Sequence, residues 1–103
     1  MELFQAEWCP HSHAVRQRLT ELGIDFQARQ VSADPEERDE LERIAGTNEI
    51  PVLVPEDRDP VCGEDDILAY LDERYEERAD AAEHRAKARE EVREFAEVRA
   101  SRG

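Results

Sequence analysis

Cys9 is the residue of this sequence best suited to chemistry, because of what surrounds it. A short apolar segment precedes it, and Pro10 and a run with helical spacing follow it. Proline is favoured as the first residue of a helix, since an N–H at that position would make no intrahelical bond. Cys9 is therefore expected at a helix N-terminus, where free N–H groups and the helix dipole stabilise a thiolate. The alternative is a small buried apolar side chain. The Cys-Pro step favours a reactive thiol.

A metal site is not expected beside this cysteine. Cys9, His11 and His13 form a Cys-x-His-x-His run. Side chains that meet on one face of a helix are three or four residues apart, so alternate residues do not converge on one ion. We expect no metal.

The net charge limits the classes of partner. The chain has 103 residues, enough for one domain, with 27 acidic against 14 basic side chains and a formal net charge of -13. Such a surface repels nucleic acid and predicts no nucleic-acid partner. It also suggests a halophilic source, because concentrated salt screens the repulsion among the acids. No segment reaches the roughly 20 apolar residues of a membrane span. Two cysteines without an export signal predict a cytoplasmic protein with free thiols.

Apolar periodicity and turn residues predict seven elements over residues 1–75. A helix over residues 10–22 buries Val15, Leu19 and Leu22 and ends at Gly23. The expected strands cover residues 1–5, 24–31, 50–54 and 61–62, and the other helices cover residues 35–45, capped by Asp34, and residues 63–75, burying Ile67, Leu68, Tyr70, Leu71 and Tyr75. This order predicts an α/β fold with a parallel first pair of strands, a closing hairpin and helices on both faces of a mixed sheet.

Residues 76–103 differ in composition, being rich in Ala, Glu and Arg. Opposite charges four residues apart, such as Glu83 with Lys87 and Arg93 with Glu97, predict a charged helical extension. Its apolar stripe is thin and consists of Ala88, Val92 and Phe95, continued either by Val98 or by the aliphatic part of Arg99. We expect weak docking on the domain or on a partner, giving a monomer or a weak dimer. A solvated helix that frays is the alternative.

Three motifs of residues 1–75 resemble those of glutaredoxins and of the N-terminal domains of glutathione transferases. Cys9-Pro10-His11-Ser12 resembles the glutaredoxin Cys-Pro-Tyr-Cys active site in a one-cysteine form. Glu49-Ile50-Pro51-Val52-Leu53 resembles the Val-Pro segment of both groups, and Gly63-Glu64-Asp65-Asp66 resembles the end of the Gly-Gly-x-Asp-Asp segment. The resemblance implies a thioredoxin-like three-layer sandwich with a small mixed four-stranded sheet over residues 1–75. It does not cover the charged helical extension that follows.

The resemblance also implies the site residues. The catalytic segment would be Cys9, Pro10, His11 and Ser12, and the thiol-binding residues Ile50, Pro51, Glu64 and Asp65. Cys9 would be the nucleophile. Pro51 would be cis and would place the backbone of Ile50 beside the sulfur. Glu64 and Asp65 would receive the γ-glutamyl end of a thiol. His11 either favours the thiolate by its charge or lines the groove.

These assignments imply a monothiol thiol–disulfide oxidoreductase acting on mixed disulfides of proteins. Ser12 stands where dithiol relatives have a second cysteine, and a hydroxyl cannot resolve a mixed disulfide. A small external thiol must then resolve it. Cys62 is the only internal candidate for this role, and the alternative for Cys62 is a buried cysteine of an edge strand. The co-substrate would be glutathione or a related γ-glutamyl thiol. The basic residues that glutaredoxins usually carry around the site are absent, so the acidic residues here would repel the glycine carboxylate of glutathione. A related thiol that lacks the glycine, such as γ-glutamylcysteine, would be repelled less.

Two other functions fit the same residues. One is an iron–sulfur cluster carrier that uses Cys9 and a bound thiol; Pro10 disfavours it, because such carriers usually have glycine there. The other is a non-catalytic thiol-binding or adaptor module with the charged tail as its contact surface. Cluster absorbance after reconstitution tests the first, and normal partner binding by a Cys9→Ser variant would favour the second.

Overall fold

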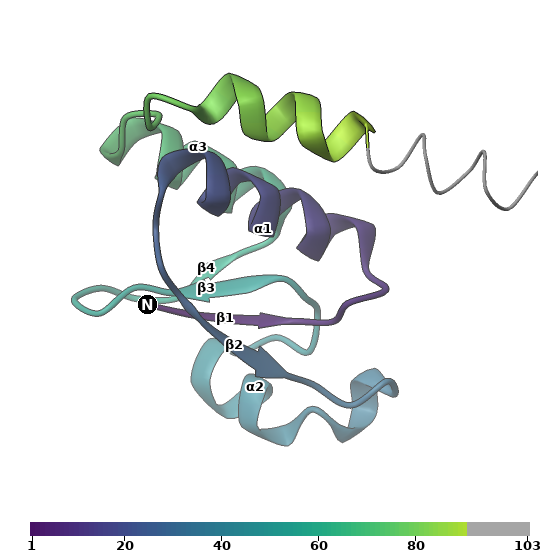
Figure 1. The fold of residues 1–103 in the computed structure, drawn as a ribbon. Helices are drawn as coiled ribbons and strands as arrows, with labels where there is room; N and C mark the ends of the chain where they lie inside the picture. Colours follow the sequence, from purple (N-terminus) through teal and green to yellow (C-terminus); the bar gives the residue numbers. More distant parts are fainter. Residues whose placement is uncertain (91–103) are drawn as a thin grey trace, which may run out of the picture.

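The computed structural model describes residues 1–90 and is built on a four-stranded mixed sheet (Figure 1). The strands are β1 (Glu2–Gln5), β2 (Gln27–Gln30), β3 (Val52–Val54) and β4 (Val61–Cys62), in the order β2-β1-β3-β4. β1 runs parallel to β2 and antiparallel to β3, and β3 and β4 form the expected antiparallel pair. The predicted mixed sheet is confirmed.

Helices cover both faces of this sheet. Figure 1 shows α1 (Pro10–Leu22) and α3 (Glu64–Arg74) on one side and α2 (Asp39–Ala45) on the other. Side chains alternate along a strand, so neighbouring residues enter different layers. Leu3 and Leu53 pack with α1 and α3, whereas Phe4 and Val52 pack with Leu41 of α2. The two apolar layers explain why residues 52–53 are buried on consecutive positions.

The helix that carries the site begins and ends where the sequence predicts. Cys9 is its N-cap and Pro10 its first residue. At the other end Gly23 has a φ of 68°, a left-handed conformation that glycine adopts without steric cost. Gly23 N–H donates to Thr20 O and Ile24 N–H donates to Leu19 O, which satisfies the last carbonyls of the helix.

Three local expectations were wrong. The predicted helix over residues 35–45 is divided into a 3₁₀ turn, η1 (Pro35–Glu37), and α2, because Arg38 leaves helical geometry with φ -91° and ψ 55°. The second strand is shorter than predicted, since Ile24 and Phe26 pack on the core before β2 begins. Tyr75 is exposed rather than buried, because α3 ends at Arg74.

The segment after α3 returns over α1. Residues 81–90 are helical, and Ala81 is buried. Arg78 N–H donates to Glu21 O at 3.0 Å, and Gln17 Nε2 donates to His84 O at 3.4 Å. The described part of the tail therefore docks on the domain. Val92, Phe95 and Val98 lie outside the described residues.

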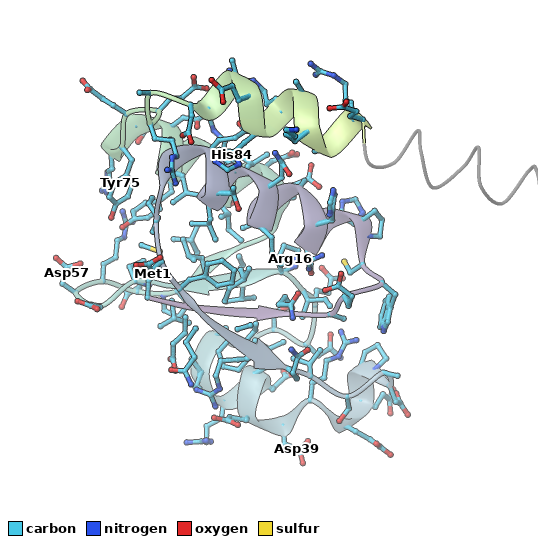
Figure 2. The ribbon with its side chains drawn as sticks, viewed as in Figure 1. Met1, Arg16, Asp39, Asp57, Tyr75 and His84 are labelled. Atoms are coloured by element: carbon cyan, nitrogen blue, oxygen red, sulfur yellow. The ribbon has the colours of Figure 1, made fainter. Side chains whose placement is uncertain are left out.

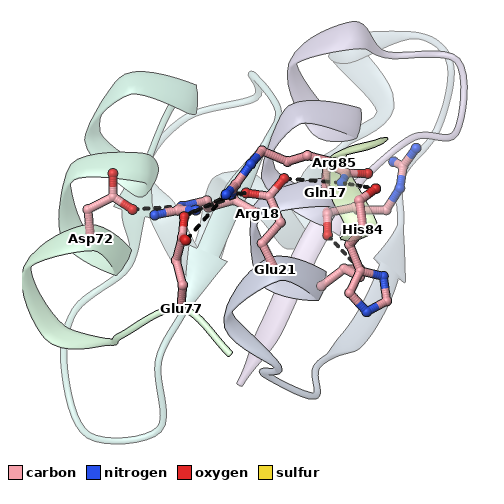
Figure 3. Close-up of polar contacts among 9 residues, drawn as sticks. Gln17, Arg18, Glu21, Asp72, Glu77, His84 and Arg85 are labelled. Carbon is pink, nitrogen blue, oxygen red and sulfur yellow. Dashed lines mark hydrogen bonds and ion pairs between the residues drawn. The ribbon is translucent and has the colours of Figure 1, made fainter. Parts of the chain in front are cut away.

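A network of ion pairs joins α1, α3 and the tail (Figure 3). Arg18 bonds Asp72 at 2.8 Å, Glu21 at 2.8 Å and Glu77 at 2.7 Å. Arg85 bonds Glu21 at 3.0 Å and Glu77 at 2.8 Å. Glu21 is buried beneath the tail, and the guanidinium groups of Arg18 and Arg85 compensate its charge. The docking is thus electrostatic as well as apolar.

Docking of the tail is expected to weaken in acid. Hydrogen bonds from Arg85 and Arg18 lower the pKa of Glu77 from an ordinary 4.5 to about 2. A depressed carboxyl pKa stabilises the folded state above the unfolded pKa, and this contribution is lost as pH falls from about 4.5 toward 2. Glu77→Gln should therefore flatten the pH dependence of the free energy of urea unfolding in this window. Glu76→Gln, at an exposed neighbouring carboxyl, is the control. Equal pH dependence in both variants would contradict the expectation.

Candidate functional site

The Cys9 thiol lies in the turn between β1 and α1. Its N–H donates to Ala6 O at 3.1 Å, and its Sγ accepts from the Ser12 N–H at 3.4 Å. The side chain is buried, and Ser12 is buried beside it. The Ala6 N–H lies 3.5 Å from Ser12 Oγ, which ties this hydroxyl to the same turn. The sequence expectation of a cysteine at a helix N-terminus agrees with this geometry.

The surroundings favour the thiolate form of Cys9. Burial raises the pKa of the thiol, but hydrogen bonds from the Ser12 side chain and from the Ser12 and His11 N–H groups lower it. The positive charge of Arg16 adds to the lowering, and the net direction is downward from the ordinary value of 9.0. His11 contributes through its backbone. Ser12 thus keeps a role beside the sulfur although it cannot act as a second thiol.

Sequence reasoning missed Arg16, which supplies the base that the residues before Cys9 lack. It follows Cys9 by two helical turns, so the two share one side of α1. Its guanidinium donates to the side chain of Gln5 and to Ala6 O at 3.4 Å, and it pairs with Glu7 at 3.5 Å. Figure 2 shows Arg16 between α1 and the sheet. The seven-residue spacing was the available signal.

A groove of about 440 Å³ lies beside this turn. It is lined by His11, Ile50, Pro51, Cys62, Gly63, Glu64, Asp65 and Asp66. The groove therefore gathers all four predicted thiol-binding residues together with His11 and Cys62. Cys9, Pro10 and Ser12 are not among the lining residues, although Cys9 precedes His11 by only two positions.

The bond between Ile50 and Pro51 is cis, as the resemblance implies. Gly63 N–H donates to Pro51 O at 3.0 Å, which joins the start of β3 to the start of α3. Gly63 has a φ of 91° and fits this turn because it lacks a Cβ. Gly63 is the N-cap of α3, and no side-chain cap bonds the first-turn N–H groups of this helix.

His11 and Glu64 meet across the groove, although they lie on different helices. His11 Nδ1 is 2.9 Å from Glu64 Oε1, a distance that fits an N–H donating to a carboxylate. Of the two expected roles of His11, this places the ring on the groove. Spacing in the sequence gave no signal for the pairing.

Two side chains near the site are exposed, those of Cys62 and Trp8. Cys62 is an exposed free thiol on β4, which removes the alternative of a buried edge-strand cysteine. Cys9 is likewise free. Trp8, which precedes Cys9, is 66% exposed, so it presents an aromatic surface instead of packing in the core.

Arg38 is a second positioning residue that the sequence did not reveal. It is buried, and its guanidinium donates to the carbonyls of Ser32 at 2.8 Å, Asn48 at 2.9 Å and Ala33 at 3.3 Å. Asn48 lies two residues before Ile50, so Arg38 anchors the approach to the groove wall. The same residue interrupts the predicted second helix.

Within residues 1–90, no group of three or more His, Cys, Asp or Glu side chains is arranged to hold a metal ion. None of the helices described there is long and apolar enough to cross a membrane.

The sequence pattern of the family described as glutaredoxin matches residues 1–58, more than half of the chain. The chain belongs to the glutaredoxin family. A curated glutaredoxin of Pseudomonas aeruginosa is 37% identical over 51 residues, which cover 50% of this chain and 61% of that relative. This glutaredoxin-family chain thus spans about three fifths of the curated relative.

Solved structures place the fold among glutathione transferases. A rice transferase solved in complex with glutathione has a TM-score of 0.65 and 30% identity, covering 85% of this chain and 43% of that one. Transferase 1-6 of Anopheles dirus has a TM-score of 0.65 and 28% identity, covering 73% and 36%. The chain therefore has the thioredoxin-like fold of a transferase N-terminal domain and spans less than half of these proteins.

Proposed function

We propose that this protein is a thiol–disulfide oxidoreductase that acts on mixed disulfides between proteins and a low-molecular-weight γ-glutamyl thiol. The observation that carries the proposal is the setting of Cys9. Cys9 is the N-cap of α1, and its pKa is lowered by Ser12, His11 and Arg16 in spite of its burial. His11, two residues further along the chain, lines the groove. Membership of the glutaredoxin family supports the same reaction.

The reaction needs two exchanges at one sulfur. The Cys9 thiolate attacks the sulfur of the small thiol in the mixed disulfide, and the protein thiolate leaves and takes up a proton. Cys9 is then joined to the small thiol. A second molecule of that thiol, as its thiolate, attacks the sulfur already bound to Cys9. The two small thiols leave joined to each other as the oxidised disulfide, and Cys9 is released as its thiolate. Over the two exchanges, the protein sulfur is reduced to a thiol, and the small thiol that was bound to it leaves joined to one further molecule as the oxidised disulfide, so each turnover consumes one free thiol.

The groove residues bind the small thiol in this proposal. The main chain of Ile50, beside Pro51, pairs with the cysteinyl unit. The α3 N-terminus at Glu64 and Asp65 receives the γ-glutamyl end, with N–H groups for its carboxylate and side-chain carboxylates for its ammonium. The solved rice transferase contains glutathione, which supports a γ-glutamyl ligand for the shared fold.

The monothiol route predicts the behaviour of a Cys62→Ser variant. If an external thiol resolves the Cys9 mixed disulfide, turnover at saturating thiol should stay within about twofold of the wild type, because Cys62 takes no part. Steady-state reduction of a mixed disulfide measures this. A large loss of turnover in the variant, with Cys9 accumulating as its mixed disulfide by mass spectrometry, would instead assign resolution to Cys62.

The function is tested by reduction of a mixed disulfide with several small thiols at low and high salt. Glutathione and γ-glutamylcysteine are expected to support turnover better than thiols without a γ-glutamyl group. Activity and folding that increase with salt would support the halophilic source. Absence of Cys9-dependent turnover with every thiol would refute the proposal. We further propose cytoplasmic location, where both thiols stay reduced, and a monomer or a weak dimer through the tail.

A further inference from the structure

The side-chain contact between His11 and Glu64 crosses the groove in which the small thiol is proposed to bind. The His11 side chain is 67% exposed and that of Glu64 29%, so both remain open to a ligand. His11 lies two residues from Cys9, and Glu64 is the first residue of α3. A γ-glutamyl group placed against α3 must therefore contact this pair or displace it.

The charges of the groove require a base for any carboxylate. Glu64, Asp65 and Asp66 all line it, and they would repel the α-carboxylate of a γ-glutamyl group. Among the lining residues, all of which lie in the described part of the chain, His11 is the one basic side chain. Without His11, the backbone N–H groups of α3 would have to offset the repulsion from these three acids by themselves.

We propose that His11 determines specificity for the zwitterionic end of the thiol; this rests on the proposed function and deepens it. An α-amino acid end carries an ammonium and a carboxylate on one carbon. Glu64 offers the complement of the ammonium, and His11 offers an N–H to the carboxylate. In the free protein the two side chains satisfy each other at 2.9 Å, and the ligand exchanges this contact for two of its own.

This exchange requires the amino-acid end and makes no use of the glycine carboxylate. The protein should therefore use γ-glutamylcysteine as well as glutathione. A thiol that lacks either charged group at the γ-glutamyl end should bind less well, because breaking the His11–Glu64 pair would go uncompensated.

Functional-group analogues test the proposal. Mixed disulfides of glutathione, of its analogue without the α-carboxylate and of its analogue without the α-ammonium are compared in steady-state kinetics. His11→Phe, which keeps a ring but removes its N–H groups, should raise KM for the glutathione substrate about five- to tenfold and leave kcat nearly unchanged. It should change KM little for the analogue without the carboxylate. Glu64→Gln should likewise raise KM for the glutathione substrate and change KM little for the analogue without the ammonium.

His13→Gln on α1 and Glu73→Gln on α3 are matched controls, since both residues are exposed and lie outside the groove. Equal losses with all substrates, or no loss with any, would overturn the assignment of His11. Binding of glutathione disulfide to Cys9→Ser protein, with and without His11→Phe, provides a readout independent of turnover. Weaker binding in the His11 variant supports the inference even if turnover is absent, and unchanged binding refutes it. Absence of Cys9-dependent turnover would refute only the proposed function.

Discussion

Replacing Cys9 by serine is expected to reduce turnover of a mixed disulfide by on the order of a thousandfold or more. A serine hydroxyl stays protonated at neutral pH and does not form a disulfide, so the first exchange cannot occur. The fold should persist, because serine is a favoured N-cap and can accept the Ser12 N–H that now bonds the sulfur. Steady-state kinetics measure the loss, and circular dichroism checks the fold. Residual turnover near the wild-type level would remove Cys9 from the mechanism.

The electrostatic surroundings of Cys9 also predict how its alkylation rate depends on pH. Because the thiol pKa is lowered from its ordinary value, the rate of alkylation by iodoacetamide should reach half its maximum at a lower pH than that of an unperturbed cysteine in a reference peptide. The thiolate is the nucleophile, so the rate rises with pH up to a plateau. A midpoint at or above the ordinary value would contradict the activation of Cys9 at the helix terminus.

Replacing Arg38 by alanine is expected to cost about 2–3 kcal/mol of the free energy of unfolding. The guanidinium is buried and donates to three carbonyls, on Ser32, Ala33 and Asn48, all of which would lose this partner. Because Asn48 leads into Ile50 and Pro51, we also expect a higher KM for the mixed disulfide. Urea unfolding and steady-state kinetics measure the two effects.

Arg43→Ala is the matched control for Arg38→Ala. Arg43 lies in α2 and is exposed, so its loss should change the free energy of unfolding by less than about 0.5 kcal/mol. The same small change in both variants would show that Arg38 does not anchor the approach to the groove.

Short-range patterns explain the parts of the fold that the sequence predicted. Pro10 and Gly23 bound α1, and the alternation of Leu3 and Phe4 assigns them to different layers of the core. The second helix was predicted poorly because Arg38 bonds backbone carbonyls outside the helix, such as that of Asn48, and its backbone is not helical. The second strand began later than predicted because Ile24 and Phe26, although periodic, pack on the core without joining the sheet.

The sequence by itself determined a cysteine at the start of a helix, an α/β element order and a strongly acidic surface. Each follows from residue type or from neighbours a few positions apart. Only the tertiary structure paired His11 with Glu64 across 53 positions and docked the tail on Glu21 through Arg85. Contacts between distant residues depend on how the layers pack, and no local pattern encodes that packing.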